Sequence, residues 1–169
     1  MGIIVARHGM PIIELTPMEV NYDLTVEEMI AGYAQSNPDI TSEHFPNCRS
    51  GRTGIVTEIG LCLVKPVSSG SGQGYSDSKV EEMVTAAGYS FEELSVLGAL
   101  KEHADELWNA GIWYIVARGP NSRWRSPLGL DVVAFNLSPG HRRFGLGGLG
   151  GRWGGDGWFL CRKSQPSDT

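Results

Sequence analysis

Apolar and polar residues alternate along the chain in short blocks, and the spacing within a block predicts its structure. Residues 2–7 form an apolar, β-branched run closed by Gly9 and Pro11, which predicts a short strand or an extended arm. Across residues 55–64 the odd-numbered positions are apolar or Thr and fall on one side of an extended chain. This pattern predicts a single strand with one strongly apolar face.

The clearest helix signal lies in the first third of the chain. Thr25 followed by Glu28 forms a capping box, in which each side chain bonds the other residue's backbone N–H. A helix is therefore expected to begin at Val26 and to end near Gly32. Residues 36–39 contain Asn-Pro-Asp and predict a turn, since proline disfavours helical geometry in the residue before it.

Two further helices are predicted after the serine- and glycine-rich residues 68–74, which are expected to form a surface loop. The first begins after Ser78, with Glu81 completing a capping box and Gly88 as its stop. The second begins with Ser90 and Glu93 as another capping box, and a break near its Gly98 is allowed for. Its apolar stripe consists of Leu94, Leu97, Leu100 and Leu107.

The last third of the chain changes to strand-like composition. Residues 112–117, 130–135 and 158–162 are β-branched or aromatic runs separated by turns with glycine and proline. The order strand, helix, strand, helix pair and three strands differs from the regular alternation of a doubly wound sheet. We therefore predict one α+β domain over residues 1–169, with a mixed or antiparallel sheet and about three helices.

Composition limits the class of protein. Of the 169 residues 41% are apolar, and no apolar run approaches the length of about 18 residues that crosses a bilayer. The first residues lack the basic start and cleavage site of a signal peptide, so a soluble, cytoplasmic protein is expected. Cys48, Cys62 and Cys161 are an odd number at wide spacings, which predicts reduced, mostly buried thiols rather than disulfides or a metal site.

Charge is distributed unevenly. The net charge is −5, which argues against nucleic-acid binding, yet the acidic residues gather before residue 112 and most basic residues follow it. Guanidinium groups and aromatic faces together bind anionic or sugar-like ligands. The candidate ligand-binding residues are therefore Arg118, Arg123, Trp124, Arg125, Arg142, Arg143, Arg152 and Trp153.

Two interpretations of this basic segment stay open. The arginines either pair with the acidic first part within the fold, while the tryptophans fill its core, or they form a free surface. In the second case the protein is a non-catalytic binding or interaction protein for a small anionic ligand, a glycan or a protein partner. A homodimer is a further option that the sequence leaves open, and no cofactor or metal is expected.

An enzymatic alternative rests on Arg7, His8 and Gly9 after an apolar strand. This tripeptide resembles the signature of the histidine phosphatases, and the resemblance implies His8 as the phosphorylated nucleophile and Arg7 as a phosphate clamp. Residues 126–128, Ser-Pro-Leu, are similar to a later element of that family but lie late in the chain. A histidine-phosphatase-like enzyme is the alternative function.

Residues 145–150 match the G-x-G-x-x-G pattern of dinucleotide-binding loops. Only 19 residues follow them, which leaves no room for the helix and second strand that such a site needs. This segment is expected to be an irregular loop that tolerates positive φ, and not a nucleotide site.

Two resemblances extend over longer stretches. Residues 22–30, 40–46, 88–94 and 158–163 resemble an uncharacterised group of bacterial proteins, including proteins encoded on mobile elements, for which no activity is implied. The order of residues 88–94 and 158–163, with a tryptophan-rich stretch between them, is similar to C-type-lectin-like domains. That second resemblance implies a lectin-like topology as one form of the predicted fold.

Overall fold

A computed structural model gives the fold and describes residues 4–7, for which only the backbone is considered, together with 9–33, 36–68, 70, 72–138 and 142–164. The described strands are β1 (Ile4–Arg7), β2 (Met10–Glu14), β3 (Met18–Asn21), β4 (Ile55–Glu58), β5 (Leu61–Val64), β6 (Tyr75–Ser76), β7 (Tyr89–Phe91), β8 (Tyr114–Ala117), β9 (Arg123–Ser126), β10 (Gly129–Asn136), β11 (Arg143–Gly148), β12 (Arg152–Trp153) and β13 (Trp158–Lys163). The described helices are α1 (Val26–Ile30), α2 (Asp77–Ala86), α3 (Leu94–Leu100), the 3-10 helix η1 (Lys101–His103) and α4 (Ala104–Asn109).

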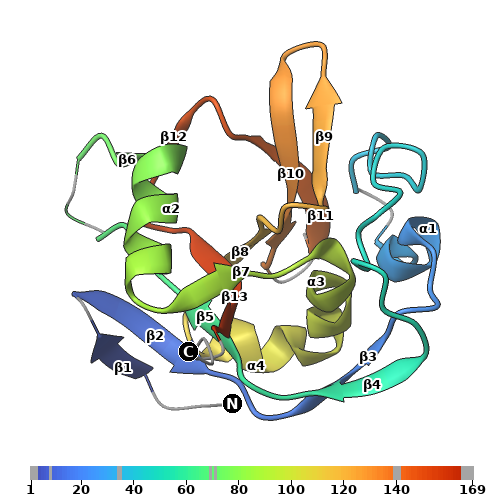
Figure 1. Cartoon of the computed structure of the whole chain (residues 1–169), viewed down its shortest axis with the longest axis horizontal. Helices are drawn as coiled ribbons and strands as arrows, with labels where there is room; N and C mark the ends of the chain where they lie inside the picture. The colour runs from blue at the N-terminus through green and yellow to red at the C-terminus, as the bar shows by residue number, and fades with distance from the viewer. Residues whose placement is uncertain are drawn as a thin grey trace, which may run out of the picture.

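A nine-stranded sheet organises the molecule and confirms the predicted α+β fold. Its main path runs β1-β2-β5-β13-β8-β10-β11, with β7 paired to β13 and β9 paired to β10. All pairs in it are antiparallel except β13 with β8, so the sheet is mixed. The structure also has two separate two-stranded antiparallel sheets, β3 with β4 and β6 with β12. In Figure 1 the β9–β10 hairpin extends at the top of the view.

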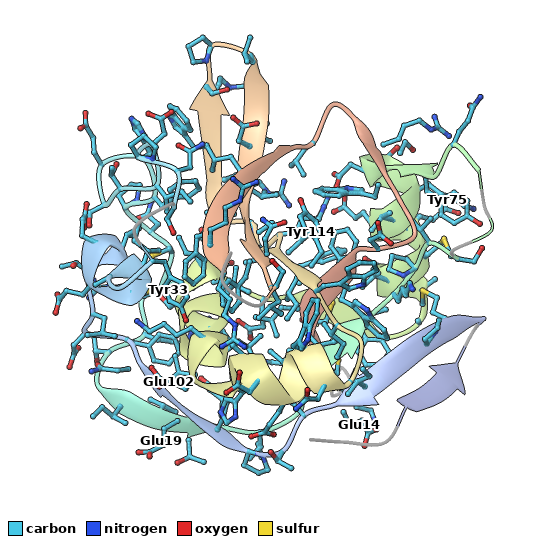
Figure 2. All side chains as sticks on the ribbon, turned by 180° about the vertical axis from the view of Figure 1, so that it is seen from behind. Glu14, Glu19, Tyr33, Tyr75, Glu102 and Tyr114 are labelled. Carbon is cyan, nitrogen blue, oxygen red and sulfur yellow. The ribbon has the colours of Figure 1, made fainter. Side chains whose placement is uncertain are left out.

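The central strands are buried on both faces, because helices cover both sides of the sheet. Leu63 and Leu160 face a core that includes residues of α1, α3 and α4. Val64, Phe159 and Cys161 face a second core closed by α2. Figure 2 shows Tyr33 beside α1 and Tyr75 near α2, at opposite sides of the molecule. Successive side chains of the central strands thus point alternately into two cores, one on each face of the sheet, and the helices form the outer layers.

Several predictions made from local signals are confirmed. The helix α1 begins at Val26, and Thr25 and Glu28 form both bonds of the capping box, at 3.1 Å each. Strands occur within residues 2–7, 112–117, 130–135 and 158–162 as predicted. The leucine stripe of the third predicted helix is buried, and the three cysteines are free and buried.

The predictions of the two later capping boxes, Ser78 with Glu81 and Ser90 with Glu93, are wrong. The helix α2 begins at Asp77, because the hydroxyl of Ser76 rather than Ser78 accepts the Lys79 N–H. Ser90 lies in β7, where pairing with β13 takes the place of a helix cap. The first N–H of α3, that of Leu94, donates instead to the Ser122 hydroxyl at 2.8 Å, a partner 28 residues away in the sequence. The expected break comes at η1, after Gly98.

Residues 55–64 do not form one strand. They form β4 and β5 with a turn between them, because Gly60 adopts φ 75°, a left-handed conformation that ends the first strand. As a result Ile55 and Ile59 are 66% and 67% exposed, whereas all four residues of β5 are buried. The predicted single apolar face is therefore wrong.

The glycine-rich segment is not an irregular loop. Residues 143–148 form β11, paired along its whole length with β10. Tyr114 and Trp153 pack closely against Gly147 because it has no side chain. A Cβ there would lie 3.3 Å from both the Tyr114 hydroxyl and the Trp153 ring. Gly147 therefore accommodates aromatic side chains. Strands β2, β3 and β9 were not predicted.

The described helices are all too short or too polar to cross a lipid bilayer. This finding agrees with the apolar-run pattern of the sequence.

The capping box of α1 gives a first test of this fold. Thr25→Ala removes the hydroxyl that accepts the Glu28 N–H, so we expect the free energy of unfolding to fall by about 1 kcal/mol. Urea unfolding followed by circular dichroism measures the change. Thr16→Ala is the matched control, since Thr16 is exposed before β3 and should change stability by less than about 0.5 kcal/mol. Equal effects of the two substitutions would contradict the assigned cap.

Candidate functional site

Two of the eight predicted ligand-binding residues, Arg118 and Trp153, converge on a carboxylate at the start of α2. Arg118 binds Asp77 through Nε at 2.6 Å and through Nη2, and the Trp153 indole N–H donates to the same carboxylate at 3.0 Å. Arg118 is 1% exposed, lies over the Phe91 ring at 4.5 Å, and also pairs with Glu81. Both residues therefore hold α2 to the sheet.

Arg142 and Arg152 also have partners within the fold. Arg142 forms an ion pair with Asp105 in α4. Arg152 donates to the backbone carbonyls of Gln73 and Gly74, at 3.2 Å each. These contacts connect the basic last third of the chain to the segments before it.

The remaining predicted residues do not gather at one place. Trp124 stacks on His44 with ring centroids 3.9 Å apart. Arg125 is exposed on β9, and Arg143 is exposed on β11, where it lines a separate cavity. Arg123 faces a groove with Arg118. The eight residues thus contribute to several environments rather than to one continuous surface.

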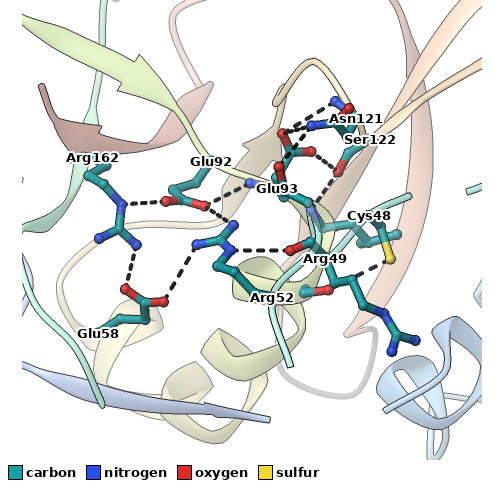
Figure 3. A network of polar contacts seen from close by, with 12 residues as sticks. Cys48, Arg49, Arg52, Glu58, Glu92, Glu93, Asn121, Ser122 and Arg162 are labelled. Atoms are coloured by element: carbon teal, nitrogen blue, oxygen red, sulfur yellow. Dashed lines mark hydrogen bonds and ion pairs between the residues drawn. The ribbon is translucent and has the colours of Figure 1, made fainter. Parts of the chain in front are cut away.

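A ring of alternating charges lies close to that groove (Figure 3). Arg162 bridges Glu92 and Glu58 at 2.6 Å each, and Arg52 bridges the same two carboxylates at 3.1 and 3.5 Å. Tyr22 adds a hydrogen bond to this ring, because its hydroxyl donates to Glu58 at 2.5 Å. Burial would raise the pKa of Glu58, but the hydrogen bonds from Tyr22 and Arg162 outweigh it and lower the pKa.

Glu93, next to this ring, has the opposite behaviour. Its side chain is buried, and burial raises the pKa of the carboxyl although hydrogen bonds from Ser122 and Asn121 oppose the shift. The Ser122 hydroxyl donates to one oxygen at 2.5 Å, and the Asn121 backbone N–H donates to the other at 3.3 Å. Glu93 therefore takes up a proton more readily than an exposed glutamate.

The groove itself has a volume of about 600 Å³ and lies between α2, β7 and the loop after β8. Three arginines line it, and two of them are neutralised, Arg52 by Glu58 and Glu92, and Arg118 by Asp77 and Glu81. Its wall also supplies hydroxyl, amide and carboxyl groups from Ser50, Thr85, Ser90, Glu92, Glu93, Asn121 and Ser164.

Arg123 is the exception among the groove arginines. No carboxylate of the described residues lies within ion-pair distance of Arg123, although its charge helps to lower the pKa of Asp77. Its Nη2 donates to the Arg118 carbonyl at 3.4 Å. Its Nε is the one buried side-chain nitrogen or oxygen of the described residues that lacks a hydrogen-bond partner. A buried donor without an acceptor costs about 1–3 kcal/mol, and such groups occur at sites that a ligand completes.

The residues of the enzymatic alternative are placed only in part. His8 lies outside the described residues, and for Arg7 only the backbone is considered. β1, which precedes His8, is an edge strand separated from β10 by four strands of the sheet path. Residues 126–128 form the tip of the β9–β10 hairpin, where Leu128 is 99% exposed. The described groups of that alternative therefore lie at distant parts of the sheet.

Sequence reasoning missed Glu93, Asn121 and Ser122. Glu93 was assigned to a helix cap, a role for which it makes no side-chain bond to its own helix. The turn residues Asn121 and Ser122 lie in the loop after the buried strand β8, and this position is the only local signal of a site there. Their convergence on Glu93 depends on the pairing of β7 and β8 with β13.

Comparison with known proteins gives no match to any family model, to any curated protein or to any solved structure. The resemblances to an uncharacterised bacterial group and to C-type-lectin-like domains therefore stay predictions. Among the described residues no group of three or more His, Cys, Asp or Glu side chains is arranged to hold a metal ion.

The Asp77–Arg118 pair predicts a pH dependence of stability. Burial would raise the pKa of Asp77, but hydrogen bonds from Arg118 and Trp153 outweigh it, so the pKa lies below the ordinary value of an aspartate. A carboxyl with a lowered pKa stabilises the fold above its unfolded pKa and loses this contribution as the pH falls through the folded value. Asp77→Asn should therefore cost about 3 kcal/mol at pH 7 and less as the pH approaches 3.

Urea unfolding of the wild type and of Asp77→Asn between pH 7 and pH 3 measures how the difference in their free energies of unfolding decreases. Asp39→Asn is the control, because Asp39 is exposed and its carboxylate has no partner among the described residues. The assignment is wrong if Asp77→Asn costs the same at every pH.

Proposed function

We propose that the protein is a non-catalytic binding protein that holds a small anionic molecule in the groove between α2, β7 and the loop after β8. The anionic group would contact Arg123, and the hydroxyl and amide groups of Ser50, Ser90 and Asn121 would bond the rest of the molecule. A phosphate or a carboxylate has the geometry that a planar guanidinium recognises.

The observation that carries this proposal is the state of Arg123. Arg52 and Arg118, the other described arginines of the groove, each have two carboxylate partners, so their charge is neutralised within the fold. Arg123 lines the same groove without such a partner among the described residues, and its Nε lacks an acceptor. An anion in the groove would pair with the guanidinium of Arg123 and neutralise its charge.

The groove chemistry favours binding over catalysis. Glu58 and Glu92 are each held by two arginines. The pKa of Glu58 is lowered, so this carboxylate is a weak base toward a substrate. Glu93 has three donors from Ser122 and Asn121 on its two oxygens, so its orientation is fixed by the fold.

Titration with sodium phosphate and with sodium malonate, at constant ionic strength, tests the proposal. Backbone amide chemical shifts followed by NMR should change at residues 118–123 and 89–93. Arg123→Gln should weaken binding by about tenfold or more, since a hydrogen bond to a charged group contributes about 1.5–3 kcal/mol.

Arg125→Gln is the matched control for this test. It removes the same charge from the same strand two residues further on, where the side chain is exposed and outside the groove. Its affinity for both anions should stay within about twofold of the wild type. Equal losses in the two variants would mean that the anions respond only to net charge, and the proposal would fail.

A further inference from the structure

A second cavity lies at the end of β8, β10 and β11, away from the arginine-lined groove. It has a volume of about 450 Å³. Tyr114, Asn136 and Arg143 form a row across three neighbouring strands, since Asn136 is paired with Tyr114 on one side and with Arg143 on the other. Figure 2 labels Tyr114 in the middle of the molecule. The other lining residues are Trp113, Leu137, Ser138 and Asp156.

Several polar side chains line this cavity. Within the described part of the chain, no side-chain hydrogen bond or ion pair engages Asn136, Ser138, Arg143 or Asp156. They offer an amide, a hydroxyl, a cation and an anion, so donors and acceptors are mixed. In the arginine-lined groove, by contrast, most such groups already bond one another.

Trp113 supplies an apolar face at the same cavity. Its side chain is 50% exposed, although it is one of the largest apolar groups of the chain. Its backbone is fixed, because the Trp113 carbonyl accepts the Leu137 N–H at 2.8 Å. A half-exposed indole beside hydrogen-bonding groups suits a ligand with one apolar face and a polar edge.

Charge distinguishes this ligand from the one proposed for the groove. Arg143 and Asp156 carry opposite charges, so the charges of the described lining residues cancel and favour no net charge on a ligand. The neighbouring hydroxyl groups of a sugar are both donors and acceptors. They can therefore bond the amide of Asn136, the carboxylate of Asp156 and the guanidinium of Arg143. The C–H face of a pyranose ring would lie on the indole of Trp113.

We infer that this cavity, lined by Trp113, Asn136, Arg143 and Asp156, binds an uncharged pyranose sugar. The inference is independent of the anion proposed for the groove, because the two cavities share no lining residue.

Titration with methyl β-glucopyranoside and methyl β-galactopyranoside, followed by tryptophan fluorescence and by saturation-transfer NMR, tests the inference. At least one of the two should bind with a dissociation constant on the order of 1 mM, as expected for a ligand of this size. Trp113→Ala should weaken that binding about tenfold, whereas Trp113→Phe should retain most of it because a phenyl ring also stacks.

Asp156→Asn is the second variant, and its side chain is exposed, so it should fold normally and also weaken sugar binding. Arg123→Gln is the control and should leave sugar binding unchanged. L-Alanine, a zwitterion that could bridge Arg143 and Asp156, is the competing probe. The inference is overturned if neither sugar binds, if Trp113→Ala binds as well as wild type, or if L-alanine binds this cavity more tightly than both sugars.

Discussion

The ion pair between Arg118 and Asp77 is the contact on which the arrangement of this fold depends. Arg118 follows the central strand β8 and is almost completely buried, and an unpaired charge there would be too costly to keep. Asp77, the first residue of α2, neutralises it and also accepts the Trp153 indole N–H. One carboxylate thus ties α2, β12 and the sheet together. The groove above them has its shape because this contact fixes two of its walls.

The same principle extends across the charge asymmetry of the chain. The ring of Arg52, Glu58, Glu92 and Arg162 connects a loop, β4, the end of β7 and the last strand, through ion pairs whose carboxylates are buried. The basic last third is therefore held to the acidic first part largely by internal pairs. Of the two interpretations open from the sequence, internal pairing accounts for Arg118, Arg142 and Arg162.

Local chemistry could be predicted from the sequence, and long-range pairing could not. The capping box of Thr25 needs residues three apart, and its bonds were predicted correctly. The cap of α3 comes instead from Ser122, 28 residues away from Leu94, and the strand pairing that places it leaves no local signal. Gly60 likewise divided a pattern that periodicity alone predicted as continuous. The groove is built almost wholly from such distant partners, so its Glu93 and Asn121 could not be predicted.

This pairing changes what the basic segment can do. Eight arginine and tryptophan residues were candidates as one surface, and the fold uses Arg118, Trp153, Arg142 and Arg152 for its own contacts. Among the described residues Arg123 and Arg143 lack carboxylate partners and also line cavities, in two different settings. Arg123 lies in a groove whose other described arginines are paired with carboxylates, and the anion that we propose there would pair with Arg123. Arg143 and Asp156 both line the second cavity, where they are the charged residues of the described lining. Because their charges are opposite, hydrogen-bond geometry rather than net charge would select the sugar that we propose there.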